Sequence, residues 1–210
     1  MSTPATVDDA GRFRYLALGD SYTIGEGVAP DDRWPARLAT LLRHRNIAMA
    51  EPQIVARTGW TCAELEAGID AAAPVGPFAL VSLLIGVNDQ YRGGSSLAYA
   101  MQLAKLVRRA RDLAGKRGRR LLILSIPDWG VSPFAAGRDR AAIAAAIDEF
   151  NLVNRRAAQL EGAAYVDVTD ASRRVVDASD YVADGLHPAA ATYDAWAKLA
   201  VDAAAQAVDA

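Results

Sequence analysis

Five short runs of branched and aromatic apolar residues recur along this chain, and longer segments with helical spacing separate them. The runs cover residues 15–18, 53–56, 80–85, 121–126 and 164–168. Each run has the length and composition of a buried β-strand. Strands that alternate with helices pair in parallel, and a parallel sheet must be covered on both faces. The pattern therefore predicts an α/β fold, a three-layer α/β/α sandwich.

The segments between the runs predict the helices that cover this sheet. Six apolar residues share one face at helical spacing and should pack on the sheet: Leu103, Leu106, Val107, Ala110, Leu113 and Ala114. Further helices are expected over residues 35–44, over 64–73 with Thr61 as a possible N-cap, and over 140–160 and 189–208. No repeat or linker divides the chain. We expect a flexible N-terminal segment, 1–12, and one domain, 13–210.

Composition excludes several classes of protein. The chain has 210 residues and a formal net charge of -2, so nothing draws it toward nucleic acid as a partner. Its one cysteine, Cys62, excludes an intrachain disulfide and a structural zinc site. Residues 1–14 lack a secretory signal, and the longest apolar stretch, 77–87, is about half of the ~20 residues that span a bilayer. We expect a cytoplasmic protein without stable membrane insertion; its oligomeric state is not indicated.

Distinctive polar motifs follow the apolar runs. In open parallel sheets, ligands bind beyond the carboxyl ends of the strands, so these motifs are where chemistry is expected. The motifs are Gly19-Asp20-Ser21, Thr58-Gly59-Trp60, Gly86-Val87-Asn88-Asp89, Pro127-Asp128-Trp129-Gly130 and, beyond the fifth run, Asp184-Gly185-Leu186-His187-Pro188. The first three ends adjoin if the strand order is 2-1-3-4-5.

The choice of a general base lies between two histidines. His44 stands between arginines at the end of a predicted helix, where a surface role is expected. His187 lies in a turn that Gly185 permits, directly before Pro188. Asp184, three residues upstream, can accept the Nδ1 proton of His187 and leave Nε2 facing outward as a base.

Ser21 is the candidate nucleophile, because its hydroxyl would project over the sheet edge from the first strand end. An oxyanion hole needs fixed donors, and the Asn88 amide and the backbone N–H groups of Ser21 and Gly59 can supply them. Each of these residues also has an ordinary interpretation. Ser21 suits any turn, Asn88 can cap a helix, and Asp184 with His187 can stabilise their own turn. Their joint placement at several strand ends favours one active site.

Aromatic and apolar residues near the strand ends are candidates for an acyl pocket. They are Trp60, Tyr91, Trp129, Val131 and Phe134, although all five are also ordinary packing residues. A competing hypothesis is a flavin- or nucleotide-binding module, in which Ser21, Thr23 and Gly25 hold a phosphate and Trp60 and Trp129 stack on a ring. It leaves Asp184 and His187 unexplained, and the chain lacks a G-x-x-x-x-G-K-[ST] loop.

Four of these motifs together, in order and spacing, resemble the sequence blocks of the SGNH hydrolases, also called GDSL esterases and lipases. The motifs are Gly19-Asp20-Ser21, Gly59, Gly86-Val87-Asn88-Asp89 and Asp184-Gly185-Leu186-His187-Pro188. Residues 15–28 and 126–130 look like the bacterial lysophospholipase/esterase type. Tyr22 stands where the GDSL name has Leu, which affects the wall of the pocket rather than a catalytic role.

The resemblance implies a flavodoxin-like sandwich with a five-stranded parallel sheet of order 2-1-3-4-5. It also implies a serine hydrolase that needs no metal. We expect no cofactor, and we expect hydrolysis of carboxylic esters of small or medium acyl chains through an acyl-enzyme on Ser21. Ser21 would be the nucleophile, His187 the base and Asp184 its orienting acid. Ser21, Gly59 and Asn88 would form the oxyanion hole. Acyl transfer to another alcohol would use the same residues, and the sequence leaves this alternative open.

Overall fold

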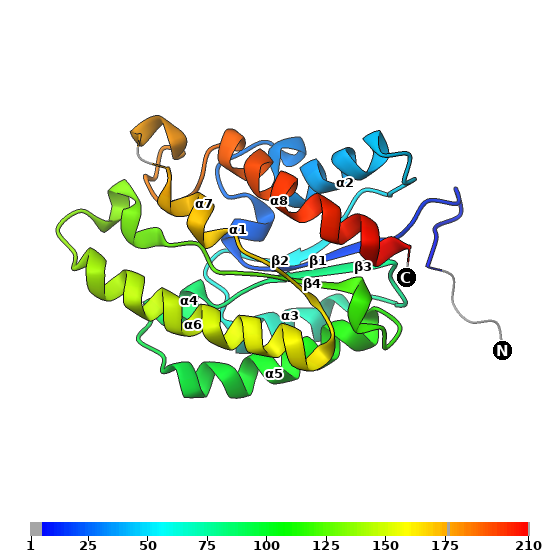
Figure 1. Cartoon of the computed structure of the whole chain (residues 1–210), viewed down its shortest axis with the longest axis horizontal. Coiled ribbons are helices and arrows are strands. Elements are labelled where there is room, and N and C mark those ends of the chain that lie inside the picture. The colour runs from blue at the N-terminus through cyan, green and yellow to red at the C-terminus, as the bar shows by residue number, and fades with distance from the viewer. Residues whose placement is uncertain (1–5, 176, 210) are drawn as a thin grey trace.

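The computed structural model describes residues 6–175 and 177–209. Its centre is a parallel sheet of five strands in the order β2-β1-β3-β4-β5, as predicted (Figure 1). The strands are β1 (Tyr15–Gly19), β2 (Gln53–Ala56), β3 (Leu80–Leu84), β4 (Leu121–Leu124) and β5 (Ala164–Val166). Each strand begins at the residue where the apolar run begins.

The sheet is buried most deeply at its centre. Every residue of β1, β3 and β4 is buried, whereas the edge strands β2 and β5 are partly exposed. The register pairs Gly19 with Ala56 on one side and with Leu84 on the other. The carboxyl ends of the first three strands in the chain therefore lie side by side, as the order 2-1-3-4-5 requires.

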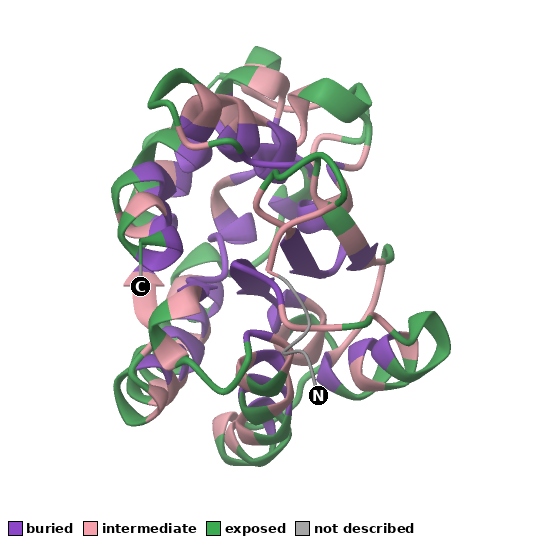
Figure 2. Cartoon of the chain, turned by 90° about the vertical axis from the view of Figure 1, so that its right-hand side faces the viewer, coloured by how far each residue is buried: buried purple, intermediate pink, exposed green. Residues whose placement is uncertain are grey.

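Helices cover both faces of the sheet and complete the predicted three layers. Helices α2 (Trp34–His44) and α8 (Ala190–Val208) pack together on one face (Figure 1). Helices α3 (Cys62–Ala72), α5 (Ser96–Leu113) and α6 (Arg140–Glu161) lie on the other. The buried residues of these helices face the sheet, and exposed residues form the outer surface (Figure 2). No helix in the described part is long and apolar enough to cross a membrane.

Local capping explains where the long helices begin. Thr61 accepts from Glu64 N–H and the Glu64 carboxylate accepts from Thr61 N–H, so the predicted cap is a full capping box. Helix α5 starts well before Leu103, the first residue of the predicted face, because the Ser95 hydroxyl accepts a bond from Ala98 N–H. The predicted face of α5 is buried, with Leu113 only half-buried.

Short helices that the periodicity did not predict follow three of the strands. They are α1 (Ser21–Ile24), α4 (Val87–Tyr91) and α7 (Thr169–Arg173). A helix of four or five residues spans little more than one turn, so it leaves no repeating pattern in the sequence. Two of these helices carry candidate site residues, Ser21 on α1 and Asn88 on α4.

The predicted N-terminal segment, 1–12, falls partly outside the described residues, as residues 1–5, 176 and 210 are not described. Phe13 forms an antiparallel bridge with Val7, and the Asp8 carboxylate accepts a 2.8 Å bond from Arg12 N–H. Flexibility of the segment stays a prediction.

Candidate active site

Ser21 stands at the turn between β1 and α1. Asp20 caps this helix, and its Oδ1 accepts a 3.0 Å bond from Tyr22 N–H. Ser21 is the first residue of the helix, so its backbone N–H has no partner within the helix. Ser21 is 4% exposed. Gly25, with φ of 62°, ends the helix after a single turn.

Gly19 allows this turn to pack tightly against β3. A Cβ atom on Gly19 would collide with the Thr23 side chain and with the Leu84 backbone carbonyl. Glycine is therefore required here for close approach rather than for an unusual φ. The same contact leaves Thr23 fully buried, with its hydroxyl unpartnered in the described structure. A phosphate bound by Ser21, Thr23 and Gly25 would need that hydroxyl at the surface, which argues against the nucleotide-binding alternative.

Asn88 joins the first three strand ends. It lies on α4, directly after β3, and its Nδ2 is 3.0 Å from the Trp60 carbonyl oxygen and 3.4 Å from Asp20 Oδ2. Because a carbonyl oxygen only accepts, the Trp60 contact fixes which end of the amide is the donor. The Asn88 N–H groups therefore face the Ser21 turn and the Gly59 loop.

Gly59 is held in place by Arg92, a residue that the sequence analysis did not single out. Arg92 Nη2 donates a 2.6 Å bond to the Gly59 carbonyl, and Nη1 reaches Glu64 at 3.2 Å. Gly59 has φ of 84°, and its N–H donates no hydrogen bond among the described residues. The Arg92 bond holds the peptide that follows Gly59, and the Gly59 N–H is free to bind a ligand atom.

Asp20 is fully buried and has no cationic partner in the described structure. Burial raises the pKa of Asp20 to about 7; the bond from Tyr22 N–H opposes the rise, and the nearby Asp89 carboxylate adds to it. Asp89 has a structural role, since its carboxylate accepts from Cys62 N–H at the start of α3. Below this pKa, Asp20 is mostly neutral and carries little charge to repel an anion beside Asn88.

Asp184 and His187 form a close pair in the loop before α8. Asp184 Oδ2 lies 2.6 Å from His187 Nδ1, and Oδ1 accepts bonds from the N–H groups of Leu186 and His187 at 2.8 and 3.0 Å. Gly185 has φ of 67°, a conformation that glycine adopts without strain. His187 is 5% exposed, whereas the Asp184 side chain is 43% exposed. The pairing predicted from the three-residue spacing is present.

This loop meets the Ser21 turn through Tyr22. The ring centroids of Tyr22 and His187 are 5.2 Å apart, so His187 lies against the residue that follows Ser21. In the described part of the chain, no hydrogen bond joins Ser21 to His187. The structure thus brings the two segments together without a hydrogen bond between Ser21 and His187.

The predicted pocket residues separate into two groups. The rings of Tyr91, Trp129 and Phe134 form one cluster, with centroid distances of 5.2 to 6.2 Å. Trp60 instead packs on Gly68 of α3, so closely that a Cβ there would collide with its ring. Val131 is half-buried in the loop after β4, outside the ring cluster.

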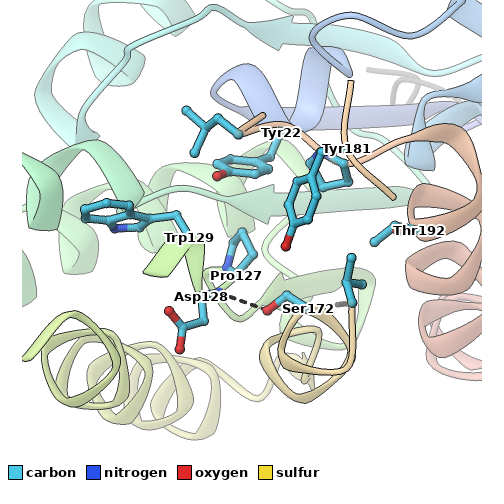
Figure 3. Close-up of a pocket in the computed structure, with 10 residues that line it drawn as sticks. Tyr22, Pro127, Asp128, Trp129, Ser172, Tyr181 and Thr192 are labelled. Carbon is cyan, nitrogen blue, oxygen red and sulfur yellow. Dashed lines mark hydrogen bonds between the residues drawn. The ribbon is translucent and has the colours of Figure 1, made fainter. Parts of the chain in front are cut away.

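A cavity of about 10 Å³ lies beside Tyr22. Its lining includes Pro127, Trp129, Tyr181 and Leu186, and Figure 3 shows the rings of Tyr22, Trp129 and Tyr181 around Pro127. This volume is about that of one water probe, so a substrate would occupy the open surface above the strand ends rather than this cavity.

Comparisons with known proteins agree with this architecture. The model of the GDSL-like Lipase/Acylhydrolase family matches residues 17–195. TesA is 23% identical with a TM-score of 0.69, covering 90% of this chain and 97% of that chain. A putative GDSL-like lipase from Parabacteroides merdae ATCC 43184 is 17% identical with a TM-score of 0.74, covering 91% and 95%.

The psychrotrophic esterase EstA from Pseudoalteromonas sp., in a structure inhibited by monoethylphosphonate, is 16% identical with a TM-score of 0.67, covering 90% of this chain and 95% of that chain. No curated protein matches the sequence. At these identities the solved structures show a shared fold.

Proposed function

Because the chain belongs to the GDSL-like lipase/acylhydrolase family, we propose that it is a serine esterase that hydrolyses carboxylic esters through an acyl-enzyme on Ser21. The observation that carries the proposal is the Asp184–His187 pair, seated against the Ser21 turn through Tyr22. A base with a fixed partner beside a serine at a strand end is the arrangement that nucleophilic catalysis requires.

His187 acts as the general base. Its Nδ1–H donates to Asp184, so Nε2 keeps the lone pair that accepts a proton. Burial raises the pKa of Asp184, but hydrogen bonds from the His187 ring and from two backbone N–H groups outweigh burial and hold this pKa below its usual value. Asp184 therefore stays ionised near neutral pH and stabilises the imidazolium that forms.

Ser21 Oγ attacks the ester carbonyl carbon while its proton passes to His187 Nε2. The tetrahedral intermediate collapses, the bond to the alcohol oxygen breaks, and His187 returns the proton to the departing alcohol. Water then attacks the acyl-enzyme with His187 as base again, which releases the acid and restores Ser21.

Three donors converge on the carbonyl oxygen in this proposal: the N–H groups of Ser21 and Gly59 and the side-chain amide of Asn88. The Asn88 contact with Asp20, at 3.4 Å, is long and is exchanged for the developing oxyanion. The contact with the Trp60 carbonyl, at 3.0 Å, remains and keeps the amide oriented. Donors that are fixed in advance stabilise the oxyanion most strongly, because they need no reorganisation during the reaction.

The missing bond between Ser21 and His187 is compatible with this mechanism. Catalytic hydrogen bonds are often long or poorly aligned without substrate and tighten in the complex. The Ser21 side chain has no competing hydrogen bond among the described residues, so it is free to rotate toward His187. Tyr91, Trp129 and Phe134 form one wall for a small or medium acyl or alcohol group in this proposal.

The test combines a substrate panel with covalent labelling. Para-nitrophenyl esters of increasing chain length measure turnover and size the pocket, and a fluorophosphonate probe labels the nucleophile. Inhibition of EstA by a phosphonate supports this choice of probe. We expect Ser21→Ala to lower kcat by more than about a thousandfold and to abolish labelling, with an unchanged circular dichroism spectrum. Turnover or labelling that survives in Ser21→Ala would remove Ser21 from the mechanism.

A further inference from the structure

Arg138 lies over the cluster of three aromatic rings at the strand ends. Its Cζ atom is 5.4 Å from the ring centroids of Tyr91 and Trp129 and 5.3 Å from that of Phe134. The Trp129 ring is itself fixed by a 2.8 Å bond from Nε1 to Gln90 Oε1. A guanidinium that packs against ring faces keeps its N–H groups around its edge, where they remain available to a ligand.

Arg138 is exposed and lacks an anionic partner in the described part of the chain. Among the described residues, its one side-chain hydrogen bond joins Nη2 to the Tyr91 hydroxyl at 3.3 Å. The neighbouring Asp139 carboxylate is used elsewhere, because it caps α6 by accepting from Ala142 N–H. The positive charge of Arg138 is therefore held in one place without being neutralised.

Another arginine over a ring shows the ordinary structural arrangement. Arg155 lies 4.4 Å from the centre of the Tyr165 ring, and its Nη2 is paired with Asp167 at 3.1 Å. Its charge is satisfied within the protein. Arg138 also lies over aromatic rings, but it has no anionic partner among the described residues.

The position of the ring cluster connects Arg138 with the active site. Tyr91 ends the helix that carries Asn88, and Phe134 N–H donates a 2.9 Å bond to the Gly185 carbonyl in the Asp184–His187 turn. Trp129 lines the cavity beside Tyr22. The cluster therefore bridges the Asn88 helix and the His187 loop, and Arg138 covers the side of it that faces solvent.

Resting on the proposed esterase function, we propose that Arg138 binds an anionic group, a carboxylate or phosphate, carried by the ester substrate. The substrate class is then an ester with a negative charge some distance from the reacting carbonyl. Arg138 would make charge-assisted, bidentate hydrogen bonds to two oxygens of that group, a geometry for which the planar guanidinium is suited. The rings below it hold the cation in place and line the path of the apolar part of the substrate.

Two matched substrate pairs test this inference and distinguish the half of the ester that carries the charge. The acyl pair is para-nitrophenyl hexanoate and para-nitrophenyl hydrogen adipate. The alcohol pair is the butyrate ester of methyl para-hydroxybenzoate and that of para-hydroxybenzoate. We expect the wild type to favour the anionic member of at least one pair by about fivefold to tenfold in kcat/KM, as a charge-assisted hydrogen bond predicts. High salt should reduce this preference.

Arg138→Met keeps an unbranched, flexible side chain and removes the charged guanidinium, so the preference for the anionic ester should disappear while turnover of the neutral esters changes little. Arg138→Lys keeps the charge without the planar fork and should retain part of the preference. Arg155→Met removes a stacked arginine remote from the site and should leave the preference intact.

The outcomes separate this inference from the function on which it rests. Hydrolysis of neutral esters without an anionic preference in either pair would overturn the role of Arg138 and leave the esterase proposal standing. A preference that Arg138→Met preserves would also overturn it. Absence of hydrolysis with all four esters, together with absence of fluorophosphonate labelling, would instead refute the esterase proposal.

Discussion

The Asp184 carboxylate holds both the ring and the backbone of His187. Oδ2 lies 2.6 Å from Nδ1, and Oδ1 accepts a 3.0 Å bond from His187 N–H. Because Oδ1 also binds Leu186 N–H at 2.8 Å, a single side chain both folds the loop and orients the imidazole. The structural and catalytic interpretations of the Asp184–His187 turn are therefore compatible.

Asp184→Asn separates these two roles. The amide oxygen can still accept the backbone bonds, but the variant has no charge to stabilise an imidazolium, and its amide N–H favours the tautomer protonated at Nε2. We expect kcat for a para-nitrophenyl ester to fall by about a hundredfold to ten-thousandfold while the urea midpoint changes little. The smaller loss is expected where solvent screening of the exposed Asp184 carboxylate weakens its attraction to the imidazolium. Activity within threefold of the wild type would contradict the orienting role.

Asn88→Ala removes the side-chain donor of the proposed oxyanion hole. We expect kcat to fall by about a hundredfold to a thousandfold with a small change in KM, because the lost bond strengthens in the transition state. Asn88→Asp keeps the size of the side chain and replaces its donor by an acceptor. Its kcat should fall at least as far as that of Asn88→Ala. Thermal melting of both variants checks that the Trp60 loop is still held. A loss confined to KM would argue for a role in ground-state binding instead.

Asp20 should make stability depend on pH. Its pKa is raised by burial from 3.8 to about 7, so the folded protein binds a proton that the unfolded chain releases. The stabilising contribution is complete below the unfolded value and is lost as pH rises through about 7. Between these two pKa values, the free energy of unfolding of the wild type should fall by about 1 kcal/mol per pH unit. We expect Asp20→Asn to abolish this fall.

Urea titrations at several pH values across this window measure the slope. Asp31→Asn, at an exposed aspartate, is the matched control and should keep the slope of the wild type. The prediction fails if Asp20→Asn and the wild type lose stability in parallel as pH rises.

Gly19→Ala should be strongly destabilising because the new Cβ would collide with the Leu84 backbone and the Thr23 side chain. We expect a loss of about 3 kcal/mol in the free energy of unfolding, measured by urea denaturation. Gly93→Ala is the control, since Gly93 has φ of 78° but open space around it, and should cost only about 1 kcal/mol of backbone strain. Equal losses at the two glycines would show that the approach of α1 to β3 is not tight.

Local sequence predicted the elements whose stability depends on neighbours in the chain. Leu103, Leu106 and Val107 repeat at helical spacing, and a helix with one buried face is found there. Thr61 and Glu64 are three residues apart, the spacing that a capping box needs. The Asp184 carboxylate likewise accepts bonds from N–H groups only two and three residues ahead of it.

Side-chain directions in the loops were not predictable in the same way. Trp60 follows a strand end, as Trp129 does, yet its ring packs on Gly68. Arg92 and Arg138 lie in loops without any periodic pattern, and each makes a contact with a distant segment: Arg92 with Gly59, and Arg138 with Tyr91.

The amino-acid sequence by itself determined the α/β alternation, the helix caps and the short turns, because each depends on interactions within a few residues of the chain. It also determined which polar groups stand at the strand ends. Only the tertiary structure decided that Asn88 reaches Asp20 and the Trp60 carbonyl, that Tyr22 contacts His187, and that Arg138 lies over the Tyr91 ring. These contacts join residues far apart in the chain, and they form because the packed layers bring separate strand ends and loops to one edge of the sheet.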